Sequence, residues 1–190
     1  MNICVFCASA NHLDEKYKND AIKLGQIIGQ NGHTLVYGGA NVGLMHMVAQ
    51  NVKFQGAERI GVVAQVIKDN NVAATDDTKQ IITPTMHERK AKMRELSDAF
   101  IALPGGFGTL EELLEVLTLK QLGVIKQPIV ILNTDHYYDS LLSQFQKAVN
   151  EGISKEVYLN LFYETDSIDK AIDFLENDKK TNRKIETKWN

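Results

Sequence analysis

The sequence predicts an α/β protein, a Rossmann-like three-layer sandwich whose central sheet is mostly parallel. Apolar runs typical of buried strands alternate with segments that carry apolar residues at helical spacing. This strand–helix–strand order favours parallel pairing with right-handed crossovers. Two of the strands lead into glycine-rich loops, at 38–43 and 105–108, where a parallel sheet would bind a ligand. The length fits one domain, which we place at 1–178, followed by a polar tail at 179–190.

The first half of the chain reads as strands and helices in alternation. Apolar runs predict strands at 3–8, 34–37, 59–63 and 81–83. Helical spacing predicts helices from Asp14 to a stop at Gly32, at 44–54, and at 86–96 with Thr85 as cap. Segment 65–79 is polar and is expected to be an irregular loop over the sheet edge.

The second half continues the alternation. Strands are expected at 99–103, 128–132 and 162–163, and helices at 109–121, 137–149, 154–159 and 167–175. The start of the helix at 109 has two interpretations. Thr109 and Glu112 fit a capping box, which would only close the helix end. Alternatively, Glu112 projects into the cleft beside a bound anion.

Composition excludes several classes of function. The chain is 44% hydrophobic and 24% charged, as in ordinary globular proteins. Its net charge of −3 gives no support to nucleic-acid or membrane-surface binding. No apolar run approaches the roughly 20 residues that span a bilayer. The N-terminus lacks the pattern of a signal peptide, so we expect a cytoplasmic protein.

Cys4 and Cys7 have the Cys-x-x-Cys spacing of redox and metal motifs. They lie in a predicted strand, where side chains three residues apart point to opposite faces. No second cysteine pair completes a zinc set. We expect both to be structural free thiols and predict no metal site.

The glycine loops suggest a phosphorylated ligand. Three glycines at 105, 106 and 108 let the backbone approach a ligand closely, and the helix start that follows favours an anion. The loop at 38–43 superficially resembles a dinucleotide fingerprint, but its glycine offsets differ and the next strand ends in Ala64-Gln65 without an acidic residue. No Gly-Lys-Ser/Thr motif supports a P-loop nucleotide site. From these residues alone, the prediction is a phosphate-binding α/β protein.

Three segments in order resemble the Lonely Guy (LOG) family of cytokinin-activating phosphoribohydrolases, formerly labelled lysine decarboxylases. They are Val-Tyr-Gly-Gly-Ala-Asn-Val-Gly-Leu-Met at 36–45, Met-His-Glu-Arg-Lys at 86–90 and Pro-Gly-Gly-Phe-Gly-Thr-Leu-Glu-Glu at 104–112. The resemblance runs from about residue 3 to about residue 175. It implies hydrolysis of the N-glycosidic bond of a cytokinin riboside 5′-monophosphate, or of AMP, to the free base and ribose 5-phosphate.

The resemblance also implies the site. Glu112 would stabilise positive charge on the ribose or activate water, and Arg89 would assist departure of the base; these two are the candidate catalytic residues. Lys90 would support the phosphate and Glu111 would line the ribose side. The candidate substrate-binding residues are Lys90, Gly105, Gly106, Phe107, Gly108, Thr109, Leu110, Glu111, Thr118, Gly38, Gly39, Asn41, Ser9 and Met86. No metal or organic cofactor is implied, and a homodimer is expected.

The chain departs from the family pattern after the third strand. Ala64 stands where family members commonly have proline, and the loop glutamate that helps hold the nucleotide has no clear counterpart; Asp69 is the nearest acidic candidate. Two other functions stay open. The protein could bind a nucleotide such as AMP without hydrolysing it. Lysine decarboxylation fits poorly, because that chemistry usually needs a Schiff-base lysine, and neither glycine loop carries an evident one.

Overall fold

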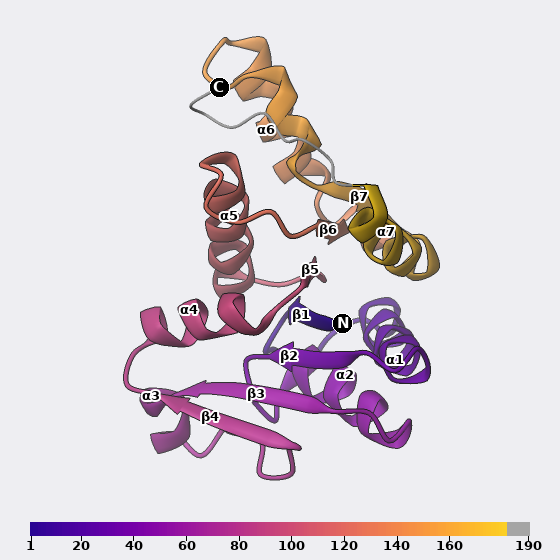
Figure 1. Ribbon diagram of the computed structural model, residues 1–190, viewed down its shortest axis with the longest axis vertical. Helices are drawn as coiled ribbons and strands as arrows, with labels where there is room; N and C mark the ends of the chain where they lie inside the picture. The colour runs from indigo at the N-terminus through magenta and orange to yellow at the C-terminus, as the bar shows by residue number, and fades with distance from the viewer. Residues whose placement is uncertain (182–190) are drawn as a thin grey trace.

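The computed structural model describes residues 1–181 and has the predicted fold (Figure 1). Within this range, seven strands form one sheet in the order β4-β3-β2-β1-β5-β6-β7, and every pairing between them is parallel. The strands are β1 Asn2–Phe6, β2 Thr34–Tyr37, β3 Arg59–Ala64, β4 Lys79–Thr83, β5 Ala99–Ala102, β6 Ile129–Leu132 and β7 Tyr163–Thr165. Strands β5 and β6 are buried at every residue, and β1, β2 and β3 at every residue but one, which explains why they read as continuous apolar runs.

Helices cover both faces of the sheet (Figure 1). The α-helices are α1 Glu15–Gln30, α2 Gly43–Phe54, α3 Gln65–Asp69, α4 Met86–Leu96, α5 Phe107–Gln121, α6 Asp139–Asn150 and α7 Ile168–Thr181, with 3-10 helices η1 Thr134–His136 and η2 Glu156–Leu161. Residues of α1, α2 and α7 join one buried core, and residues of α4, α5, α6 and η2 join the other. Cys7 belongs to the first core and Cys4 to the second, so the prediction of opposite faces is confirmed, and both thiols are free.

The strand order places a topological switch point between β1 and β5. From β1 the chain winds outward through β2, β3 and β4, and it then returns to the other side of β1 as β5 before reaching β6 and β7. Phe6 pairs with Ala102, so the loops that follow these two strands leave the same edge together. In parallel sheets, ligands bind outside the carboxyl ends of the strands at such a point. One of the two loops is the glycine loop after β5.

Two sequence predictions need correction. Segment 65–79 is not wholly irregular, because it contains the short helix α3 and the start of β4. Helix α5 begins at Phe107, with Gly106 as N-cap and no side-chain capping bond, so Thr109 and Glu112 do not form a capping box. The capping box lies instead one helix earlier, between Thr85 and Glu88 at the start of α4. The predicted tail at 179–190 lies almost wholly beyond the described residues.

Candidate active site

An ion pair between α4 and α5 stands at the switch-point edge. The Arg89 guanidinium donates from Nη1 to Oε1 of Glu112 over 2.8 Å, and the two side chains are only 8% and 13% exposed. Arg89 also donates from Nε to the Val62 carbonyl at 3.0 Å. The two candidate catalytic side chains are therefore in direct contact and fixed against the sheet.

Glu112 is free for this contact because α5 starts before Thr109. At that start the helix is capped by backbone alone, which leaves the Glu112 carboxylate to face α4. Burial raises the pKa of Glu112, and the neighbouring Arg89 guanidinium partly offsets that effect. A desolvated carboxylate with a raised pKa is a better proton acceptor than an ordinary glutamate, and such groups gather at functional sites.

The Arg89 guanidinium occupies space that is open because residue 38 is glycine. A Cβ atom on this glycine would lie 2.0 Å from Nη2 of Arg89, so any side chain here would displace the guanidinium. Its neighbour Gly39 has φ +63°, a conformation that side chains other than glycine's rarely adopt. The loop at 38–43 thus has a structural requirement for glycine at both positions.

The loop at 38–43 is held from two sides. Segment 72–74 pairs with it, because Asn41 donates its amide to the Val72 carbonyl and Ala74 donates to the Gly39 carbonyl, both over 2.7 Å. On the other side, the Gly43 amide donates to Oδ1 of Asn11 at 2.9 Å. Asn11 follows β1, so both of these loops converge at the switch-point edge.

The glycine loop after β5 carries the first turn of α5 toward the same edge. The first intrahelical bond of α5 is donated by Leu110 to the Gly106 carbonyl, so the amides of Phe107, Gly108 and Thr109 precede it. Thr109 is buried, and a Cβ atom on Gly105 would lie 2.1 Å from its Oγ1 atom. Close contact between Gly105 and Thr109 explains why this loop needs glycine at 105.

Not every predicted residue joins this arrangement. Lys90 of α4 forms ion pairs with Glu111 and Glu115 of α5, the second at 2.9 Å. Met86 and Phe107 are 43% and 95% exposed, and Ser9 and Asn41 are exposed at the same edge. Leu110 is half-buried and packs against the core on the α5 side.

The acidic residues of the divergent segment are committed elsewhere. Asp69 accepts a hydrogen bond from Gln65 at 2.7 Å. Asp76 pairs with Lys53 of α2 at 2.6 Å, and the buried Asp77 accepts from the Tyr37 hydroxyl at 2.7 Å. None of these contacts directs a carboxylate at the Arg89–Glu112 pair.

Sequence analysis missed two tyrosines that touch the glycine loop. Tyr137 donates its hydroxyl to the Gly105 carbonyl and Tyr138 donates to the Leu103 carbonyl, each over 2.7 Å. The adjacent Tyr-Tyr pair after a strand was a visible signal, but nothing in its spacing indicates a contact more than 30 residues back along the chain.

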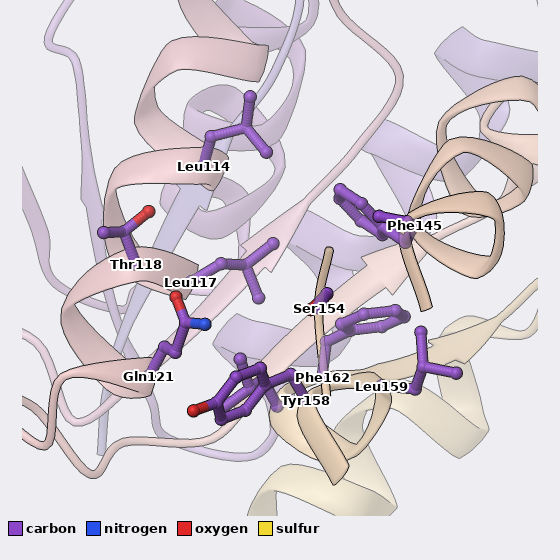
Figure 2. Close-up of a pocket in the computed structure, with 11 residues that line it drawn as sticks. Leu114, Leu117, Thr118, Gln121, Phe145, Ser154, Tyr158, Leu159 and Phe162 are labelled. Carbon is purple, nitrogen blue, oxygen red and sulfur yellow. The ribbon is translucent and has the colours of Figure 1, made fainter. Parts of the chain in front are cut away.

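A separate cavity of about 160 Å³ opens between α5, α6 and η2 (Figure 2). Thr118 lies on its wall, six residues further along α5 than Glu112, which is nearly two turns. Figure 2 shows Leu117, Tyr158 and Phe162 around the same space, so its lining is mainly apolar. Thr118 is therefore not beside the Arg89–Glu112 pair within one copy of the chain.

Neither a metal centre nor a membrane span is found within residues 1–181. Among residues 1–181, His, Cys, Asp and Glu side chains do not gather in groups of three or more that could hold a metal ion. Within the same range, no helix is both long and apolar enough to cross a membrane.

Comparison with known proteins identifies relatives by sequence and by fold. Residues 45–175 match the family described as possible lysine decarboxylase. The cytokinin riboside 5′-monophosphate phosphoribohydrolase LOG7 of Arabidopsis thaliana is 45% identical over 79% of this chain and 69% of its own length. LOG1 of the same plant, which carries the same enzyme name, is 40% identical over 98% of this chain and 87% of its own length.

Among solved structures, the molybdenum cofactor binding protein of Rippkaea orientalis superposes with a TM-score of 0.71 at 26% identity, covering 94% of this chain and 96% of that one. A Moco carrier protein of Chlamydomonas reinhardtii gives a TM-score of 0.69 at 21% identity, which shows the shared fold. The segment that matches the family includes Arg89, the glycine loop and Glu112. The matches to the two sequence relatives extend over most of the length of each relative. The chain belongs to the LOG family, whose family model carries the description possible lysine decarboxylase.

Proposed function

We propose that this protein hydrolyses the N-glycosidic bond of a nucleoside 5′-monophosphate, a cytokinin riboside 5′-monophosphate or AMP, to the free base and ribose 5-phosphate. The observation that carries the proposal is the buried Arg89–Glu112 pair at the switch-point edge, beside the glycine loop. Family members that are 39–46% identical are named for this reaction on cytokinin ribosides.

The chemistry requires a carboxylate near the anomeric carbon. Cleavage of the bond between C1′ and the base leaves positive charge on the ribose, as in sugar hydrolysis. Glu112 stabilises this charge and accepts a proton from the water that attacks C1′. The bonding electrons leave with the base, which takes up a proton, so water is consumed and two products form. Arg89 orients the Glu112 carboxylate and assists departure of the base.

The glycine loop supplies the phosphate end of the site. The amides of Phe107, Gly108 and Thr109 lie at the start of α5, where the helix dipole adds to their attraction for an anion. The Lys90 ammonium is paired with Glu111 and Glu115, so we assign it a smaller share in holding the phosphate than the sequence suggested. The phosphate is therefore held chiefly by backbone groups and the Thr109 hydroxyl.

The surroundings of Lys90 argue against lysine decarboxylase activity. Lys90 is the lysine nearest in sequence to the Arg89–Glu112 pair. Burial acts to lower the pKa of its ammonium, but hydrogen bonds to Glu111 and Glu115 more than offset this, and the pKa is raised. A Schiff-base lysine needs an unprotonated amine. The raised pKa instead keeps the Lys90 amine protonated.

We further propose a homodimer in the cytoplasm. Leu114 is 41% exposed on α5 next to the apolar cavity of Figure 2, which offers a surface for a second copy. Such packing would place Thr118 of one copy near its partner. Light scattering should give twice the chain mass of 21.3 kDa, and a strictly monomeric active protein would contradict the dimer.

The test of the proposed function is product analysis. Purified protein is incubated separately with AMP and with isopentenyladenosine 5′-monophosphate, and the free base and ribose 5-phosphate are assayed. Release from either substrate is expected, and the ratio of rates decides between nucleotide salvage and cytokinin activation. Absence of both products from both substrates would refute the proposal.

A second candidate is binding without hydrolysis, favoured by the likeness to a molybdenum cofactor binding protein at 26% identity. The Arg89–Glu112 pair weighs against it. A desolvated carboxylate repels a phosphorylated ligand and costs stability when buried, so a pure carrier gains nothing from it. Tight binding of AMP with no release of adenine would favour this second candidate.

A further inference from the structure

The four carbonyl groups of residues 103–106, which lead into the first turn of α5, all accept hydrogen bonds from other groups of the protein. The Leu103 carbonyl accepts from the Tyr138 hydroxyl at 2.7 Å, and the Pro104 carbonyl accepts from the Ala8 amide at 3.1 Å. The Gly105 carbonyl accepts from the Tyr137 hydroxyl at 2.7 Å. The next carbonyl, of Gly106, accepts the first intrahelical bond of α5. Four successive carbonyl oxygens thus have donors in the fold itself.

This arrangement fixes the direction of the loop amides. In a trans peptide group the carbonyl and the following N–H point in opposite directions. A donor that holds the Gly105 carbonyl therefore turns the Gly106 amide the other way. Because glycine lacks a Cβ atom, the peptide between Gly105 and Gly106 can rotate at low cost when this donor is absent. The Tyr137 hydroxyl is the donor that restrains this peptide group.

Tyr137 is itself held firmly. Its ring makes edge contacts with Tyr17, at 5.8 Å between centroids, and with Tyr138, at 4.9 Å. The turn that delivers it contains Asp135 at φ +48° and His136 at φ +62°, two consecutive residues in the left-handed region. Such conformations are costly for residues other than glycine. Strain of this kind persists where the surrounding structure enforces it, and it accumulates at functional sites.

We propose that Tyr137 is a positioning residue for the phosphate site, acting through its hydrogen bond to the Gly105 carbonyl. The bond keeps the carbonyl away from the phosphate and the Gly106 amide available to it. Tyr137 does not touch the substrate in this role. The inference rests on the proposed function, since it concerns how the same site holds the 5′-phosphate.

The test compares Tyr137→Phe with wild type. Phenylalanine keeps the ring contacts and removes only the hydroxyl. Loss of one hydrogen bond predicts a KM for AMP that is about threefold to tenfold higher. The kcat should stay within about twofold, because the phosphate is held equally in the ground and transition states. Tyr163→Phe, on edge strand β7 with its ring stacked on Phe174, is the matched control and should change neither constant.

Product inhibition separates positioning from general loosening. Ribose 5-phosphate carries the phosphate and adenine does not. The inhibition constant of ribose 5-phosphate should rise by the same factor as the KM in Tyr137→Phe, while that of adenine should not change. An unchanged KM, or equal increases for both products, would overturn the inference.

Failure of the proposed function would look different. It would appear in the wild-type protein as no release of free base from either AMP or isopentenyladenosine 5′-monophosphate, and the inference would fall with it. Urea unfolding of Tyr137→Phe serves as the folding check, and Tyr137 is 42% exposed, so the substitution should leave the fold intact.

Discussion

Replacing Glu112 with glutamine tests the catalytic role most sharply, because the substitution keeps size and shape and removes only the charge. A positioned general acid or base contributes about a hundredfold to ten-thousandfold to the rate. At about 1.4 kcal/mol for each factor of ten, that is about 3–5 kcal/mol of transition-state stabilisation. We therefore expect the kcat of Glu112→Gln on AMP to fall by at least a hundredfold.

Stability should respond differently from activity. The glutamine oxygen can still accept from Arg89, which also keeps its bond to the Val62 carbonyl. The loss is that of a charged hydrogen bond replaced by a neutral one, about 1 kcal/mol. Burial raises the pKa of Glu112, so its ionised form is less favourable in the folded state at neutral pH. Removing the charge therefore offsets part of the stability lost with the charged hydrogen bond. The free energy of unfolding should stay within about 1 kcal/mol of wild type.

The assay measures adenine release and urea unfolding on the same preparations. The matched control is Glu115→Gln, since Glu115 lies on the same helix and pairs with Arg94 of α4 at 2.5 Å. This control should retain activity within about threefold, because Glu115 pairs with Arg94 and Lys90 and makes no ion pair with Arg89. Activity of Glu112→Gln within tenfold of wild type, or an equal loss in Glu115→Gln, would refute the catalytic assignment.

Three further substitutions have defined outcomes. Gly38→Ala should lower kcat/KM for AMP about a hundredfold, because its Cβ atom would push the Arg89 guanidinium aside; activity near wild type would show that Arg89 need not sit there. His136→Gly should raise the free energy of unfolding by about 0.5–1 kcal/mol in urea, because it relieves a left-handed residue, whereas a loss would contradict strain at this turn. Asp77→Asn should change the pH dependence of stability. Burial raises the pKa of Asp77, so the stabilisation from this group is full below about pH 4 and is lost as the pH rises through the folded-state pKa. Urea unfolding from pH 4 to 7 should show wild type losing stability relative to the variant, and parallel curves would contradict this.

The fold could be predicted from the sequence because its signals are local. Buried parallel strands read as apolar runs, and Thr34–Tyr37 and Met86–Leu96 have the predicted bounds. Boundaries were less certain where caps depend on backbone geometry. Thr109 and Glu112 match a capping box in sequence, yet Gly106 caps α5 without a side chain, and that moved the start of the helix to Phe107.

The site was only partly predictable because its contacts join distant segments. The family motifs pointed to Arg89 and Glu112, and the structure brings these two together. The position of Lys90 in the same motif did not reveal that Glu115, one turn after Glu111, would share its ammonium. Tyr137 reaches Gly105 through a strained turn that no propensity predicts. Such contacts depend on tertiary packing and leave no local pattern.

The central claim, hydrolysis at the N-glycosidic bond, is tested most directly by running the reaction on AMP in water labelled with oxygen-18 and analysing the products by mass spectrometry. The account predicts that the label enters ribose 5-phosphate, through the oxygen bound to C1, and that adenine is released in equal amount. Label in inorganic phosphate with release of adenosine would instead show cleavage of the phosphate ester and would contradict the account.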